Sequence, residues 1–170
     1  TSHYPDAPWF TELCDRYGFY VIAESDIEMH GYLSTYHSDR ENTLGLLDEG
    51  GVFTEAVLDR VQRNVIRDKN HPCVLIWSLG NEAGFGYQNA GRWTKEYDPT
   101  RLTHYESSTW DHSNRFDKSM LDLYSRMYAT TEEIDSYFAE EGPKKPFIQC
   151  EFVHAMGNGP GDIEDYYQQI

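Results

Sequence analysis

Residues 73–84 read Cys-Val-Leu-Ile-Trp-Ser-Leu-Gly-Asn-Glu-Ala-Gly, a largely apolar run that opens into a glycine-containing loop with a glutamate. Residues 73–79 are apolar on both faces, which is typical of a parallel strand covered by helices or enclosed in a barrel. Glu82 follows where the strand ends, so it leaves the packed interior while the strand beneath holds its position. This stretch predicts a parallel α/β fold with a functional side chain at a strand end.

The same arrangement occurs a second time near the end of the chain. Residues 146–150 form a short apolar run, and Glu151 follows directly, at the start of Glu-Phe-Val-His-Ala-Met-Gly-Asn. A single loop glutamate is usually a solvated side chain. Two glutamates in the same setting make that interpretation much weaker and indicate paired acid/base and nucleophile chemistry.

The composition is that of an acidic globular chain. Its 170 residues are 39% hydrophobic and 15% aromatic, enough for one domain with a packed core. The formal net charge of −15 disfavours nucleic acid as a partner, because phosphate binding relies on clustered cations. No run approaches the roughly 18 apolar residues of a membrane span, and no leader signal is visible at the N-terminus. We therefore expect no membrane contact and a cytoplasmic location.

The three cysteines, Cys14, Cys73 and Cys150, are far apart, and none belongs to a Cys-x-x-Cys pair. This spacing disfavours a disulfide framework and a structural zinc site. Two of them lie inside apolar runs, as small buried hydrophobic residues do. A reducing compartment fits this pattern.

Hydrophobic periodicity and turn residues indicate alternating helices and strands. Helices are predicted near residues 8–17, 53–66, 87–97, 131–142 and 162–170. Strands are predicted near residues 19–23, 73–79, 102–105, 121–124 and 146–150. Thr130 and Glu133 have the spacing of a capping box at the start of the fourth helix. The fold class is therefore α/β.

Two architectures have such an alternation, a doubly wound sheet and a (β/α)8 TIM barrel. A doubly wound nucleotide-binding sheet carries a glycine fingerprint after its first strand, whereas residues 19–23 are followed by acids. The barrel is favoured, although a complete one usually has about 250 residues. We expect residues 1–170 to be a fragment of a catalytic TIM-barrel domain with about five of its eight strands. Loops after barrel strands share one face, so Glu28, Glu82 and Glu151 are expected to converge.

Facing carboxylates are a device for cleaving glycosidic bonds. One is protonated and assists the leaving oxygen, while the other is ionised and either attacks the sugar or activates water. A short separation of the two carboxylates would indicate retention of configuration, and a longer one inversion.

Six motifs carry a resemblance to a known family. They are Ser2-His3-Tyr4-Pro5, Leu13-Cys14-Asp15-Arg16-Tyr17-Gly18, Asp26-Ile27-Glu28-Met29-His30-Gly31, Arg67-Asp68-Lys69-Asn70-His71-Pro72, Trp77-Ser78-Leu79-Gly80-Asn81-Glu82 and Cys150-Glu151-Phe152-Val153-His154-Ala155-Met156-Gly157-Asn158. In this order they resemble family 2 glycoside hydrolases, specifically the large β-galactosidases. The resemblance covers nearly the whole chain, and six motifs in family order are highly specific.

The resemblance implies an enzyme that hydrolyses terminal non-reducing β-D-galactosides such as lactose. It implies a retaining double displacement within a larger protein, with Glu82 as the acid/base and Glu151 as the nucleophile. It further implies substrate contacts from His3, Asn81, Tyr128 and His154. From the residues alone, each of these histidines and Tyr128 has a structural role as its alternative.

The resemblance also implies a Mg²⁺ site beside the acid/base, with Glu28, His30 and Glu82 as ligands. Two carboxylates and one imidazole suit Mg²⁺, with Mn²⁺ as the alternative. Without the family match, a Glu-x-His pair in a loop is weak evidence for a metal, because two ligands do not fix its geometry.

Other readings stay open at this point. The substrate alternatives are those of a β-glucuronidase or a β-mannosidase of the same family. A non-catalytic carbohydrate-binding or metal-binding fragment is a further alternative. An open barrel exposes strand edges and apolar surface, so we also expect a homo-oligomer.

Overall fold

The computed structural model describes residues 1–31, 50–84, 86–110, 116–142, 144–155 and 161–169. Only the ends of the predicted connection at 31–51 fall within these ranges. Residues 156–158 of the second glutamate stretch lie outside them, as do position 143, directly after one predicted helix, and position 170, at the end of another.

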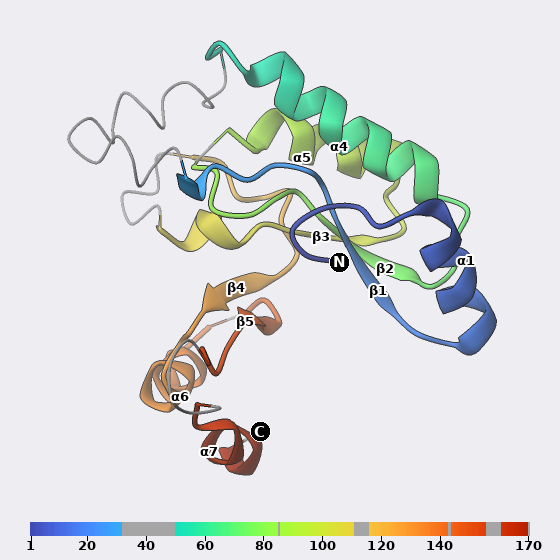
Figure 1. Ribbon diagram of the computed structural model, residues 1–170. Coiled ribbons are helices and arrows are strands. Elements are labelled where there is room, and N and C mark those ends of the chain that lie inside the picture. The colour runs from blue at the N-terminus through green and yellow to red at the C-terminus, as the bar shows by residue number, and fades with distance from the viewer. Residues whose placement is uncertain (32–49, 85, 111–115, 143, 156–160, 170) are drawn as a thin grey trace.

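Helices and strands alternate along the chain, as Figure 1 shows. In order, the elements are α1 (Pro8–Tyr17), β1 (Val21–Glu24), α4 (Thr54–Asp68), β2 (Val74–Ser78), α5 (Gln88–Tyr97), β3 (Leu102–His104), the 3₁₀ helix η2 (Glu106–Trp110), β4 (Tyr124–Met127), α6 (Thr131–Ala139), β5 (Phe147–Glu151) and α7 (Ile163–Gln169). β1, β2 and β3 form one parallel sheet in that order, and β4 pairs in parallel with β5. This confirms an incomplete (β/α)8 barrel with five strands in the described part of the chain.

The core lies between the three-stranded sheet and the helices α4 and α5, which run side by side over one face of it (Figure 1). Val57, Val61 and Val65 recur every four residues on α4, so all three point to the sheet and are buried. Trp77 on β2 is fully buried, and its indole N–H donates to Asp98 Oδ2 at 2.9 Å. The sheet is therefore a rigid base for the loops at its carboxyl edge.

Several predicted boundaries are confirmed. The first helix spans the predicted residues and ends at Gly18, whose φ of 76° is the left-handed conformation common at helix C-termini. The capping box of α6 is present: Thr130 Oγ1 accepts from the Glu133 amide at 3.2 Å, and Glu133 Oε2 accepts from the Thr130 amide at 2.8 Å. α6 is three residues shorter than predicted, since it ends at Ala139.

The fourth strand was predicted in the wrong place, at 121–124 instead of Tyr124–Met127. Leu121 and Leu123 are buried, but they lie in the connection before the strand. Asp122 between them accepts from the Thr103 amide at 2.7 Å and from Lys95 Nζ at 2.6 Å. The hydrogen bond from Thr103 to Asp122 thus holds the connection against β3, and the burial of Leu121 and Leu123 gives it the burial pattern of a strand.

A chain of buried polar side chains crosses the interior from β1 to β4. Ser78 Oγ donates to Glu24 Oε2 at 2.8 Å, so its oxygen is left to accept from His104 Nδ1 at 2.9 Å. His104 Nε2 then accepts from Ser125 Oγ at 2.6 Å. The hydrogen bonds all run toward Glu24 and join the two sheets.

The buried histidine in this row of polar side chains predicts that the protein is less stable in mild acid. Burial lowers the pKa of His104 to about 4, against an ordinary value near 6.5. Between these values the unfolded chain binds a proton that the folded chain does not. The free energy of unfolding therefore decreases as the pH is lowered through this range, by roughly 3 kcal/mol in total. Urea unfolding at pH 7 and pH 4.5 checks this, with His104→Gln as the variant that should lose the dependence.

The comparison with His104→Gln is needed because protonation of Glu24 changes the stability in the opposite direction as the pH falls. Burial raises the pKa of the Glu24 carboxyl, so the folded state binds its proton more readily as the pH falls. An equal acid response in wild type and variant would show that His104 does not govern the stability in this range.

Two further expectations can be compared with the structure. No helix in the described ranges is long and apolar enough to cross a membrane. All three cysteines are free: Cys14 and Cys73 are buried, and Cys150 is half-buried. Burial raises the pKa of Cys73 to about 12 and of Cys150 to about 11, so both thiols stay protonated.

Candidate active site

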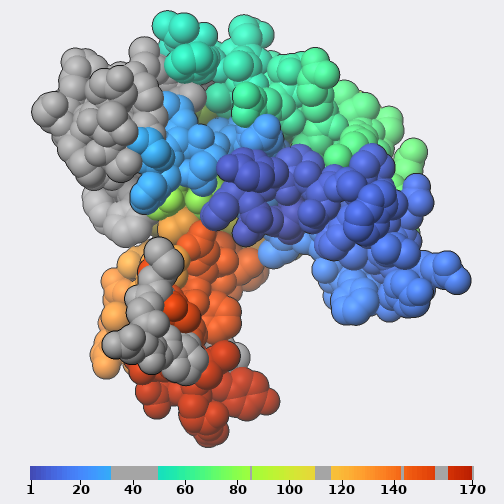
Figure 2. Space-filling view, in the orientation of Figure 1, coloured from blue at the N-terminus to red at the C-terminus, as the bar shows by residue number. Residues whose placement is uncertain are grey.

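A pocket of about 370 Å³ opens at the carboxyl ends of the strands. Its lining residues are His3, Glu28, His30, Gly31, Glu82, Tyr128, Glu151 and His154. Figure 2 shows the surface hollowed between the blue N-terminal part and the orange and red C-terminal part. Glu28, Glu82 and Glu151 thus converge as the strand-end argument predicted, and the volume is in the range of small-molecule sites.

Glu82 is held in an unusual main-chain conformation. In the loop after β2, Gly80 has a φ of 144°, and an added Cβ there would lie 2.8 Å from Ile27 Cβ. The Asn81 amide donates to Ile27 O at 2.8 Å, which ties the loop to the one after β1. Glu82 itself has a φ of 42°, and its amide donates to Glu106 Oε1 at 2.8 Å. Non-glycine residues in this region persist only where surrounding contacts hold them, and such residues cluster at functional sites.

Glu151 is the last residue of β5, and Tyr128 holds it from the neighbouring strand end. The Tyr128 amide donates to Glu151 O at 2.8 Å, and its hydroxyl donates to Glu151 Oε2. This hydroxyl bond, together with burial, raises the pKa of Tyr128 to about 12. The His154 ring meets the Tyr128 ring edge-on, with centroids 5.1 Å apart. Tyr128 and His154 therefore lie beside the predicted nucleophile.

The three residues predicted to bind a metal meet at this pocket. Glu28 Oε1 accepts from the His30 amide at 2.8 Å, and His30 Nδ1 is 2.5 Å from Glu82 Oε2. Their donor chemistry fits Mg²⁺. Within the described ranges, however, no group of three His, Cys, Asp or Glu side chains is arranged to hold a metal ion. The donor atoms of His30 and Glu82 face each other in a direct hydrogen bond instead.

The predicted substrate residues differ in their placement. His3 lines the pocket, with its Nδ1 3.7 Å from Glu24 Oε1 and from Glu28 Oε2. Asn81 does not line it: the side chain is buried, and Nδ2 donates to Glu28 Oε2 at 2.7 Å. In this structure Asn81 therefore orients Glu28.

Sequence reasoning assigned no role to two buried carboxylates close to the pocket, Glu24 and Glu106. Glu24 ends β1 and faces His3, and Glu106 follows β3 and binds the Glu82 amide. Both stand at the carboxyl end of a strand, so the rule that singled out Glu82 and Glu151 was the signal that could have found them. Neither is followed by a glycine-rich loop, so neither was predicted as a site residue.

The family is shown by comparison with known sequences. The model "Glycosyl hydrolases family 2, TIM barrel domain" matches residues 1–170. A β-galactosidase of Actinobacillus pleuropneumoniae is 47% identical over 99% of this chain and 19% of its own length. A β-galactosidase of Staphylococcus xylosus is 42% identical over 98% of this chain and 17% of its own length. The chain thus spans less than a fifth of the length of these curated relatives.

Solved structures agree on the fold. A β-D-glucuronidase of Dictyoglomus thermophilum has 25% identity and a TM-score of 0.57, covering 80% of this chain and 24% of that chain. A β-glucuronidase of Ruminococcus gnavus has 23% identity and a TM-score of 0.57, covering 82% of this chain and 27% of that chain. By its motifs, its strand-end pocket and these matches, the chain belongs to glycosyl hydrolase family 2 and is part of its TIM barrel domain.

Proposed function

We propose that this chain is the catalytic segment of a retaining β-galactosidase, acting as part of a larger enzyme. The observation that carries the proposal is the pair Glu82 and Glu151, which reach one pocket from the ends of two different strands. The high identity to β-galactosidases over nearly the whole chain supports the same activity.

In the proposed first step, the Glu151 carboxylate attacks the anomeric carbon of the bound galactoside. The bond from that carbon to the aglycone oxygen breaks, and Glu82 gives its proton to the leaving oxygen. Glu151 is then esterified to the sugar. The Tyr128 hydroxyl, bonded to Glu151 Oε2, fixes which carboxylate oxygen is free to attack.

In the second step, Glu82 acts as a base and takes a proton from water. The water oxygen attacks the anomeric carbon, and the ester bond to Glu151 breaks, which returns both carboxyl groups to their starting states. His3 and His154, on the pocket wall, are the proposed partners of sugar hydroxyls. Asn81 contributes in this proposal by orienting the Glu28 carboxylate with its side-chain hydrogen bond.

The charge of the pocket favours a neutral sugar over a glucuronide. Its lining side chains include three carboxylates, and none of the described lining residues is Lys or Arg. A uronic acid would bring a further carboxylate against these carboxylates, with no Lys or Arg among the described lining residues to pair it, which is unfavourable in a partly buried site. We therefore place β-glucuronides, and the glucuronidase neighbours in structure, behind β-galactosides.

The test is hydrolysis of nitrophenyl β-galactoside, β-glucuronide and β-mannoside by the full-length protein. We expect kcat/KM for the galactoside to exceed the others by about 100-fold or more, because hydroxyl contacts discriminate strongly between sugars. Preference for another glycoside would overturn the substrate. Sugar binding without turnover of any of the three would favour the non-catalytic alternative.

We also propose that Mg²⁺ binds at Glu28, His30 and Glu82, with Mn²⁺ as the alternative. The donor chemistry supports this, and binding requires the His30 side chain to turn from its hydrogen bond with Glu82. When bound, the ion supplies positive charge that offsets the carboxylates around it.

Chelation is therefore expected to lower the activity of the full-length protein by about tenfold or more, with recovery on adding Mg²⁺. Glu28→Gln removes one charged ligand and should shift the Mg²⁺ concentration for half recovery upward. Galactoside assays across a Mg²⁺ titration measure both. Full activity of the wild type in excess chelator would contradict the metal proposal and leave the glycosidase proposal standing. The cytoplasmic location and the homo-oligomer stay predictions.

A further inference from the structure

Glu106 is a deeply buried carboxylate that the mechanism above does not use. It is 1% exposed and is the first residue of η2, separated by Tyr105 from the end of β3 at His104. Its Oε1 accepts from the Glu82 amide at 2.8 Å and also from the Ser107 hydroxyl. Its contact with the proposed acid/base runs through the main chain.

The loop that carries Glu82 is fixed from both sides. Toward β1, the Asn81 amide bonds Ile27 O, and the Asn81 side chain bonds Glu28. Toward β3, Glu106 bonds the Glu82 amide, and the Tyr105 hydroxyl donates to Gly84 O at 2.8 Å. The clamp toward β3 is thus made by two consecutive residues.

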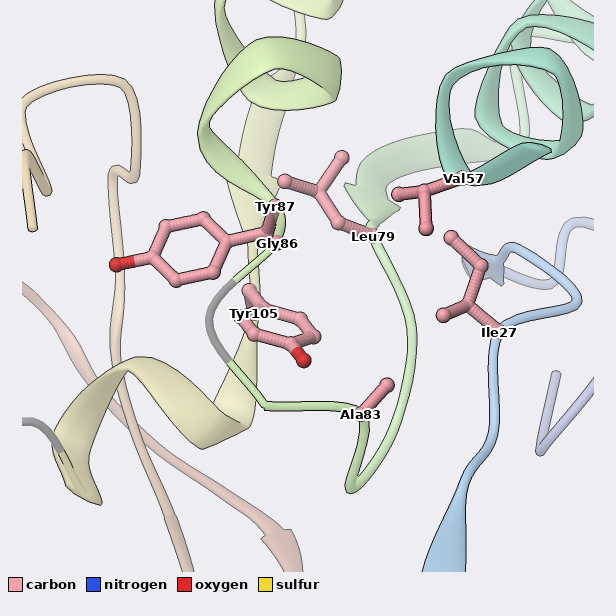
Figure 3. A pocket seen from close by; sticks show the side chains of 7 residues that line it. All are labelled: Ile27, Val57, Leu79, Ala83, Gly86, Tyr87 and Tyr105. Atoms are coloured by element: carbon pink, nitrogen blue, oxygen red, sulfur yellow. The ribbon is translucent and has the colours of Figure 1, made fainter. Parts of the chain in front are cut away.

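Apolar side chains around Tyr105 and Ala83 leave the Glu82 loop little room for movement. Tyr105 and Ala83 line a small cavity (Figure 3). Its volume of about 10 Å³ is no larger than one water molecule needs. The other side chains that line it are Ile27, Val57, Leu79, Gly86 and Tyr87. The loop therefore has close apolar packing on one face and the Glu106 hydrogen bond at Glu82 itself.

The hydrogen bond from the Glu82 amide to Glu106 holds the main chain of Glu82 in an unfavourable conformation. A φ of 42° costs a non-glycine residue roughly 1 kcal/mol or more, so the conformation needs contacts that hold it. A charged acceptor makes a stronger bond to an amide than a neutral one does. If the bond were lost, the backbone could relax and move the Glu82 carboxyl away from the leaving oxygen.

We infer that Glu106 is a positioning residue for Glu82, holding the main chain so that the carboxyl faces the glycosidic oxygen. This rests on the proposed glycosidase function. A purely structural role, supporting η2 through Ser107, would reduce the amount of folded enzyme without changing how it treats different leaving groups.

The experiment compares two galactosides in the full-length protein. Protonation by the acid matters greatly for lactose, whose leaving alcohol is poor, and little for 2,4-dinitrophenyl β-galactoside, whose leaving group departs as an anion. For Glu106→Ala we expect kcat/KM to fall about 100-fold for lactose and less than about threefold for the dinitrophenyl substrate. Glu106→Gln keeps an acceptor oxygen and should restore most of the lactose activity.

The control is Asp98→Asn, which alters another buried carboxylate that bonds Trp77 and Arg101 away from the pocket. It should lower both activities by the same factor. If Glu106→Ala fails to fold, Glu106→Asp, which withdraws the carboxylate by one methylene, should shift the ratio in the same direction. Equal losses on both substrates would overturn the inference, whereas a wild type inactive on both would overturn the proposed function.

Discussion

Replacing Glu151 with Gln should lower kcat/KM for aryl β-galactosides by about 10⁴-fold or more in the full-length protein. The amide has the shape of the carboxylate but cannot form the ester to the sugar. The Tyr128 hydroxyl, which now donates to Glu151 Oε2, could still bond the amide oxygen, so the fold around the site should persist. The variant thus removes chemistry and leaves the pocket in place.

Steady-state assays measure the loss, and a 2-fluoro-galactoside gives an independent readout. Wild type should gain the mass of one fluorosugar on the peptide that contains Glu151, and the variant should gain none. Glu141→Gln, at an exposed glutamate after α6, is the matched control and should behave as wild type. A Glu151→Gln enzyme that keeps a tenth of wild-type activity would show that another group is the nucleophile.

The second large effect is expected at Gly80. An alanine there would have its Cβ 2.8 Å from Ile27 Cβ and 2.9 Å from Ile27 O, at a φ of 144° that side chains rarely adopt. We expect Gly80→Ala to cost at least about 3 kcal/mol of stability, because neither strain nor overlap can be relieved without moving the backbone. The same shift would displace Glu82, so the remaining folded enzyme should lose about 100-fold in activity.

Gly18→Ala is a control that separates the strain of a positive φ from the steric overlap of an added Cβ. Gly18 also has a positive φ, of 76°, but an added Cβ would meet nothing within 4 Å. We expect this control to cost only about 1 kcal/mol and to leave activity unchanged. Thermal unfolding and galactoside assays of both variants check the difference. Similar losses for the two glycines would mean that the approach of Ile27 to the loop after β2 is unimportant.

The parts of the site that could be predicted are those tied to a single strand. Glu82 and Glu151 each follow an apolar run, and the barrel geometry alone brings such residues to one face. Their placement at one pocket confirms that argument. The helix α1 and the capping box of α6 were predictable for a similar reason, since their signals are local in sequence.

The parts that could not be predicted depend on neighbouring strands. Asn81 bonds Glu28 from the adjacent strand end, a contact that the sequence does not indicate, while its contact with the sugar stays a prediction. His104 was given no role, and its partners are 26 and 21 residues away on β2 and β4. The strand-end position of Glu106 could have been noticed, but its bond to the Glu82 amide could not be predicted. Such contacts follow from strand register, which a sequence pattern does not reveal.

The polar chain from Ser125 through His104 and Ser78 to Glu24 also limits how this sequence can change over evolutionary time. Each member is buried and hydrogen-bonded to the next, so replacing one by an apolar residue leaves its neighbours unpaired. Replacing the whole set together would leave no unpaired group and could be nearly neutral. Substitutions here should therefore be strongly epistatic, so that the interior layer is either kept whole or exchanged as a block.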